Sequence, residues 1–171
     1  MVEMITGLTV AARVVTFVAD YQSYKQSKRK EDDLAVRRFI LNRSNSARGQ
    51  TNKILKWAYK NGNSDLENSA KGILQELDLL KNEVNLAETG IKWPFFTPKC
   101  SVDVNTLEKI IDFDAGILEE MEQVVKALRE MELAIAEEEY DIMKGMIMID
   151  TAIGRTRDNF RDRIELIKGQ K

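Results

Sequence analysis

Apolar residues between Leu107 and Ile135 recur at alternating intervals of three and four, as on one face of an amphipathic helix. The central stripe of this face comprises Leu107, Ile111, Leu118, Met121, Val125, Leu128 and Ile135. Four more apolar residues widen it, and only Asp114 and Glu132 interrupt it. Because so wide an apolar face needs several partner helices, this stretch predicts the main helix of a helical bundle.

The same spacing continues beyond Ile135 as far as Ile167. One helix over that whole length would extend about 90 Å at 1.5 Å per residue, which is too long for a compact domain. We therefore expect a kink or turn between Glu137 and Gly145. An extended antiparallel coiled coil is the alternative.

The first predicted helix runs from about Met4 to Ser27. Its polar residues form one narrow stripe, and almost every other residue as far as Ala19 is apolar or small. Such a segment is either the central helix of the bundle or a segment that enters a membrane. The two alternatives are compatible if a trigger releases the segment from the bundle. The membrane-insertion candidates are Ile5, Leu8, Val15, Phe17 and Val18.

A basic cluster follows the apolar segment directly. Its members, and the candidates for contact with anionic lipid, are Lys25, Lys28, Arg29 and Lys30. Basic residues beside an apolar helix are attracted to anionic membrane surfaces. The alternative is a solvated helix end, after which Glu31, Asp32 and Asp33 begin the next helix, where the helix dipole favours acidic side chains.

The middle of the chain predicts two further helices. Residues 34–41 are helical in pattern, whereas the polar residues 42–52 are either a loop or an exposed part of the same helix. Asn61-Gly62-Asn63 predicts a stop. Ser64 with Glu67 predicts a capping box for the next helix, and Gly90 fits its C-terminal end. The expected buried positions are Leu66, Ala70, Ile73, Leu74, Leu77, Leu80 and Val84.

Residues 91–102 predict a loop that contains Trp93, Phe95 and Phe96 between two prolines. Three aromatic residues in a loop either close one end of the core or form an exposed contact face for a partner or a membrane. Asn105 with Glu108 predicts the cap of the helix that follows.

Composition supports an all-α fold, a bundle of four to five long, mainly antiparallel helices in a single domain over residues 1–171. Apolar residues make up 43% and charged residues 32%, and two prolines and nine glycines are few for a β-rich fold. The net charge of −2 divides into +7 for residues 1–60 and −9 for the remainder. The basic first part either packs against the acidic helices or faces an anionic partner. Nucleic acid is disfavoured, because the basic residues lack interleaved aromatics and any known DNA-binding pattern.

The chain contains no histidine and one cysteine, Cys100, and it lacks phosphate-binding glycine motifs and zinc-ligand spacing. No nucleophile or acid–base set can be assembled, so we expect no enzyme, no cofactor and no metal site. The many carboxylates are expected on a solvated face. A lone cysteine either fits a cytoplasmic protein or carries no information about location. Recruitment to a membrane is expected if the first segment is membrane-active.

Two stretches resemble HeLo and HeLo-like domains. One is Leu107–Asp112 with Ala115-Gly116 and Leu118–Glu122, preceded by Trp93 in the connector; the other is Gly7–Phe17, which leads to Tyr21 and Tyr24. The four-helix domain of the necroptosis pseudokinase is similar to this family. Pro94, Pro98 and the acidic residues 137–141 depart from the pattern.

The resemblance implies a bundle that stays inactive until a signal, then oligomerises and permeabilises membranes with its N-terminal apolar segment. Family members carry further domains, so this chain would be the N-terminal domain of a longer protein or a stand-alone unit. The rival hypothesis is a non-catalytic interaction or scaffold module that binds itself or another helical protein through its helix faces.

Overall fold

The computed structural model describes residues 10–87, 93–135 and 142–169. Four long helices dominate these ranges: α2 (Arg29–Lys60), α3 (Ser64–Leu86), α4 (Val104–Ala134) and α5 (Ile142–Lys168). A 3-10 turn, η1 (Pro94–Phe96), lies between α3 and α4, and the described residues contain no strand. The predicted all-α helical bundle is confirmed.

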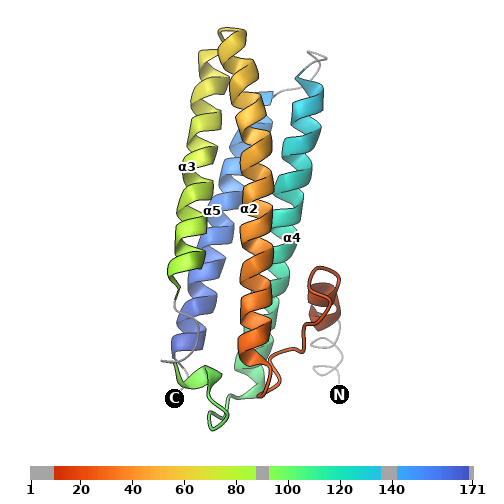
Figure 1. The fold of residues 1–171 in the computed structure, drawn as a ribbon, viewed down its shortest axis with the longest axis vertical. Coiled ribbons are helices and arrows are strands. Elements are labelled where there is room, and N and C mark those ends of the chain that lie inside the picture. The colour runs from red at the N-terminus through yellow and green to blue at the C-terminus, as the bar shows by residue number, and fades with distance from the viewer. Residues whose placement is uncertain (1–9, 88–92, 136–141, 170–171) are drawn as a thin grey trace.

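The four long helices form a square in which α2 packs against α3 and α4, and α5 packs against the same two helices. Consecutive helices run in opposite directions, as expected, so the side-by-side pairs α2–α4 and α3–α5 are parallel (Figure 1). This places α3 and α4 at diagonal corners. The chain between them must therefore cross the lower end of the bundle, where η1 contacts both α2 and α5.

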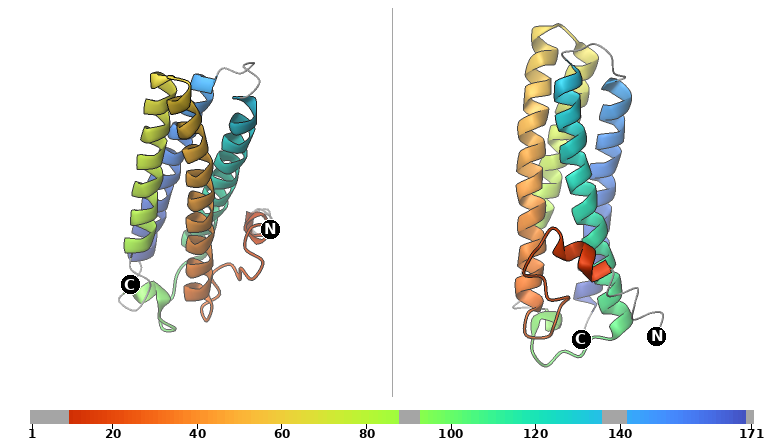
Figure 2. Two further views of the ribbon diagram at one scale, coloured as in Figure 1. Left: turned by 45° about the horizontal axis from the view of Figure 1, so that its top comes forward. Right: turned by 90° about the vertical axis from the view of Figure 1, so that its right-hand side faces the viewer.

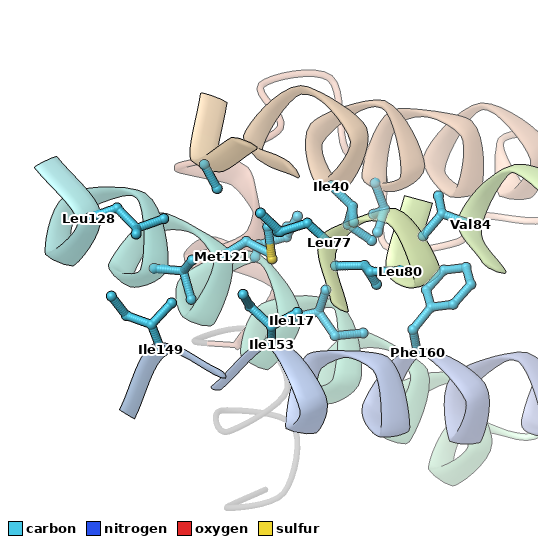
Figure 3. Close-up of a cluster of buried hydrophobic side chains, with 14 of the residues drawn as sticks. Ile40, Leu77, Leu80, Val84, Ile117, Met121, Leu128, Ile149, Ile153 and Phe160 are labelled. Carbon is cyan, nitrogen blue, oxygen red and sulfur yellow. The ribbon is translucent and has the colours of Figure 1, made fainter. Parts of the chain in front are cut away.

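The apolar faces of all four helices meet in one core (Figure 3). The stripe predicted to begin at Leu107 is divided between two helices, since α4 ends at Ala134 and α5 starts at Ile142. The expected change of direction thus lies between two described antiparallel helices, around residues 136–141, which fall outside the described ranges. Gly90 also falls outside them, and α3 ends earlier, at Leu86.

The polar stretch 42–52 belongs to one continuous helix, α2. Its inward positions are the small residues Ser44, Ala47 and Thr51, all fully buried. The Ser44 hydroxyl donates to the Ile40 carbonyl and the Thr51 hydroxyl to the Ala47 carbonyl, each at 2.8 Å. Both hydroxyls are thereby satisfied within the helix, which is why a polar sequence can line a core here.

Both predicted helix caps are wrong by one or two residues. Asn63, not Ser64, caps α3, because its side-chain oxygen accepts from the Leu66 N–H at 3.0 Å. Asp103, not Asn105, caps α4 and accepts from the Thr106 N–H at 2.9 Å. The predicted stop at Gly62 is confirmed by its left-handed backbone, with a φ of 66°.

The predicted first helix from Met4 to Ser27 is wrong within the described residues. Only residues 10–15 are helical there, and turns follow as far as α2. The segment lies outside the four-helix square, across α2 and α4 near the lower end (Figure 2). The prediction of a central helix is therefore also wrong: the four amphipathic helices already bury one another and leave no central position.

Candidate functional site

The N-terminal segment, defined as residues 10–24, packs on the surface that α2 and α4 form together. Val14 is fully buried and Val18 nearly so. The Phe17 ring meets the Phe39 ring of α2 edge-on, with their centroids 5.5 Å apart. On α4, Glu119 pairs with Arg13, whose Nε lies 2.7 Å from Oε1. The segment is thus attached by a few side chains rather than by a long helical interface.

The segment reverses direction at Ser23 and Tyr24, which both have left-handed backbones, with φ of 54° and 56°. This conformation is costly for residues other than glycine. Asp32 of α2 stabilises it: its carboxylate oxygens accept from the Gln22 N–H at 2.8 Å and from the Tyr24 N–H at 2.7 Å. Burial raises the pKa of Asp32, and the two N–H donors oppose that rise.

Beneath the reversal lies a buried polar cluster, which consists of Tyr21, Tyr24, Asp33, Arg37, Asp114 and Arg163. Arg163 of α5 is its centre, with no exposed surface. Its Nε lies 2.5 Å from Asp114 Oδ1 of α4, and its Nη1 lies 2.8 Å from Asp33 Oδ1 of α2. Asp33 Oδ2 also pairs with Arg37 Nε at 2.8 Å. Two carboxylates and two guanidinium groups balance in charge, as buried ions must.

Two tyrosines connect the N-terminal segment to this cluster. The hydroxyls of Tyr21 and Tyr24 both donate to Asp114 Oδ2, at 2.9 and 2.6 Å. Arg163 in turn donates to the Tyr24 hydroxyl oxygen. Burial raises the pKa of both phenols far above the ordinary value, so both stay protonated and keep donating. The segment is therefore bound to α4 and α5 through hydrogen bonds in the interior.

The charges in the cluster follow from their surroundings. Burial by itself would lower the pKa of Arg163, but the attraction of Asp114 and Asp33 raises it well above the ordinary value. Burial also raises the pKa of Asp114, against the opposing charge of Arg163 and the hydrogen bond from Tyr24. Asp114 is the acceptor in all three hydrogen bonds described above, and an ionised carboxylate can only accept. The arrangement therefore suits the ionised form.

Two buried arginines of α2, Arg37 of the cluster and Arg29, hold the lower end of the bundle together. Arg37 donates to the carbonyls of Val84 and Ala87, at the end of α3. Arg29 donates from Nη1 to the carbonyls of Phe95 and Cys100, each at 3.0 Å. The crossing connection between α3 and α4 is thereby bound to α2, the helix that also carries Asp32 and Asp33.

The predicted membrane-insertion residues have different environments. Val15 is 42% exposed, Phe17 is half-buried and Val18 is buried. Ile5 and Leu8 lie outside the described residues. In this closed position against α2 and α4, the segment exposes part of its apolar surface to solvent, and the rest packs against the bundle.

The predicted lipid-contact cluster is partly corrected. The side chains of Lys25, Lys28 and Lys30 are exposed at the lower end of the bundle. Arg29 is only 5% exposed and points inward to the carbonyls of the crossing connection, so the prediction that it contacts lipid is wrong.

Of the three loop aromatics, Phe95 is fully buried, whereas Trp93 and Phe96 are half-buried. Phe95 packs edge-on against Tyr24, with centroids 5.6 Å apart, and Arg29 lies over its ring at 5.0 Å. The aromatics therefore close the lower end of the core. Phe95 cannot serve as the exposed contact that was the alternative, and only Trp93 and Phe96 keep accessible surface.

Sequence reasoning did not find the buried polar cluster, although its positions carried a signal. Asp114 is one of the two interruptions in the apolar stripe of α4, and Arg163 falls on the apolar stripe that continues through α5. A charged residue at a core position needs a buried partner. The pairing of these two residues, 49 positions apart, was not readable from spacing.

A partly apolar groove of about 340 Å³ runs between α4 and α5 in their upper halves. Its lining includes the small residues Ala127, Ala134, Gly145 and Ala152, together with Met131 and Met148. Met148 is 64% exposed. The groove lies on the α4–α5 side of the bundle, whereas the N-terminal segment lies on the α2–α4 side.

Across the described residues, His, Cys, Asp and Glu side chains form no group of three or more that could hold a metal ion. Within the same ranges, no helix combines the length and the apolar character needed to cross a bilayer. Comparisons with protein-family models, with curated protein sequences and with solved structures give no match.

Proposed function

We propose that this chain is a non-enzymatic signalling bundle of the cell-death type. On a signal, the N-terminal segment detaches, the protein self-associates, and the apolar residues of the segment enter a membrane surface. The observation that carries this proposal is the position of the segment. It lies outside the square of four helices and is attached through the buried side chains of Val14 and Val18 and through the contacts of Arg13, Phe17, Tyr21 and Tyr24.

Three further observations support a detachable segment. The long helices pack against one another on all four sides of the square. Ser23 and Tyr24 hold strained backbones that detachment would relax. The HeLo-like resemblance of residues 7–17 and 107–122 implies the same kind of resting and released states.

The released segment would act at the bilayer interface. Val15, Phe17 and Val18, with Ile5 and Leu8 before them, would enter the boundary between headgroups and acyl chains, as amphipathic helices do. Lys25, Lys28 and Lys30 follow directly and are exposed. Each lysine near an anionic surface contributes about 1 kcal/mol of attraction. The protein would thus remain in the cytoplasm until release recruits it to an anionic membrane.

We expect Val15→Glu to abolish the slow leakage of dye from anionic lipid vesicles that the wild-type protein causes without a signal, when its segment detaches only transiently. Val15 is 42% exposed in the closed structure, so a glutamate is tolerated in the resting fold. At the membrane it places a charge on the inserting face, where charge is strongly disfavoured. Fluorescence dequenching of the trapped dye measures the rate of leakage.

Leu133→Glu is the matched control, because Leu133 is 67% exposed and lies on α4, away from the segment. It introduces the same charge at another exposed apolar position, and the variant should release dye from vesicles at the wild-type rate. The proposal would be wrong if anionic vesicles stayed sealed even with Tyr21→Phe/Tyr24→Phe protein, whose segment lacks the hydrogen bonds to Asp114, or if Val15→Glu and Leu133→Glu had equal activity.

The α4–α5 groove favours a second candidate function, an interaction or scaffold module without membrane activity. Its small residues would let a partner helix approach closely, and its methionines adapt to different side chains. A strictly monomeric protein in sedimentation at micromolar concentration, with no co-purifying partner, would argue against this candidate.

A further inference from the structure

Detachment of the N-terminal segment uncovers a surface with specific requirements. Phe39 loses its aromatic partner and Glu119 its guanidinium partner. Asp32 loses both backbone N–H donors, and Asp114 loses two hydroxyl donors in the interior. An occupant of this α2–α4 surface must replace these contacts. In the order of residues 13–24, it must supply a cation, an aromatic ring, a hydroxyl, two nearby backbone N–H groups and a second hydroxyl.

We propose that the α2–α4 surface of one copy binds the N-terminal segment of a second copy, so that two chains exchange residues 10–24 reciprocally. This inference rests on the proposed function in one respect, the detachment of the segment. The partner is a second copy because its residues 10–24 make every contact that the surface requires. Exchange of an identical element between protomers needs no new interface chemistry.

The connector, residues 25–28, suits such an exchange. All four of its side chains are exposed, and it leads directly into α2 at Arg29. Its turn depends on local hydrogen bonds, such as the Lys28 N–H to the Lys25 carbonyl at 2.7 Å. Opening this turn lets four residues extend over roughly 13 Å, which moves the segment away from its own bundle. The closed monomer and the exchanged dimer then hold the same segment contacts, so protein concentration selects between them.

Charge reversal at Arg13 and Glu119 tests the exchange. In Arg13→Glu the segment meets Glu119 with like charge, and in Glu119→Arg it meets Arg13 with like charge. A mixture of the two proteins restores both attractive pairs only when the segments are exchanged. We expect heterodimers in the mixture, with an association constant about ten-fold or more above that of either variant alone. Native mass spectrometry resolves them, because the two variants differ in mass.

The double variant Arg13→Glu/Glu119→Arg is the control, since it restores the pair within one chain and should stay as monomeric as the wild type. A mixture without heterodimer enrichment would overturn the exchange. Vesicle leakage that persists in that case would leave the proposed function standing. Heterodimers together with vesicles that stay sealed would support the exchange and contradict the proposed membrane activity.

Shortening the connector gives an independent test. Deleting Gln26 and Ser27 leaves two residues between Tyr24 and Arg29, too few for the present turn, so reversal within one chain is hindered and exchange is favoured. We expect this variant to elute as a dimer, whereas insertion of Gly-Ser after Ser27 should keep the monomer. A shortened protein that stays monomeric, with the Gln22 and Tyr24 amides still protected from hydrogen exchange, would contradict the proposal.

Discussion

Replacing Arg163 with leucine is expected to lower the free energy of unfolding by about 3–5 kcal/mol, the usual loss when one partner of a buried ion pair is removed. Arg163 has no exposed surface and contacts both Asp33 and Asp114. Without it, Asp33 keeps its pair with Arg37, whereas Asp114 loses the guanidinium group of Arg163. The Tyr24 hydroxyl also loses a donor. The leucine fills only part of the vacated volume.

Urea denaturation followed by circular dichroism measures this loss. Arg155→Leu is the control, because the Arg155 side chain is 66% exposed where it pairs with Glu120. A surface ion pair of this kind contributes at most about 1 kcal/mol. Equal effects of the two substitutions would show that the buried polar cluster does not stabilise the bundle as described.

Replacing both Tyr21 and Tyr24 with phenylalanine is expected to loosen the N-terminal segment while the bundle stays folded. Asp114 Oδ2 accepts from both hydroxyls, and their loss leaves a buried acceptor atom without these two donors. The two losses together cost about 2–4 kcal/mol. This cost falls on the closed state of the segment, because an opened segment lets water reach Asp114.

Hydrogen exchange at the Gln22 and Tyr24 amides reports this opening, since both amides donate to Asp32 only while the segment is closed. Their exchange should accelerate about 30-fold or more in the double variant. Amides in the middle of α3, such as Leu77, should accelerate much less. Tyr59→Phe is the matched control, because Tyr59 is 76% exposed. Uniform acceleration across all helices would mean that the segment does not open separately.

The bundle could be predicted because its evidence is local and repeated. The apolar stripe of α4 and the buried positions of α3 follow directly from helical periodicity, which depends only on the sequence of one element. Helix ends were predicted less well, since Asn63, Ser64, Asp103 and Asn105 are all acceptable capping residues. Which of two nearby candidates caps the helix depends on where the chain turns into the helix, which the sequence alone does not show.

The N-terminal segment could not be predicted correctly from its pattern. A run of apolar residues from Met4 to Ala19 fits a central helix, and only the other four helices show that no central place exists. The reversal at Ser23 and Tyr24 depends on Asp32, a residue that the sequence also allowed as an ordinary helix-starting acid.

The buried polar cluster shows a similar limit. Asp114 and Arg163 each broke the apolar pattern, and such interruptions indicate that a partner is needed. They do not indicate which one, because the crossing connection and the order of the helices bring α2, α4 and α5 together. The same topology turned Arg29 inward, away from the three exposed lysines beside it.

The link between segment release and membrane activity is tested most directly by vesicle leakage with the Tyr21→Phe/Tyr24→Phe protein. The variant keeps every apolar residue of the segment and removes its hydroxyl hydrogen bonds to Asp114 and Arg163. At equal protein concentration, we expect it to release dye from anionic vesicles about ten-fold or more faster than the wild type. Equal or slower release, in a variant whose Gln22 and Tyr24 amides do exchange faster, would contradict the account.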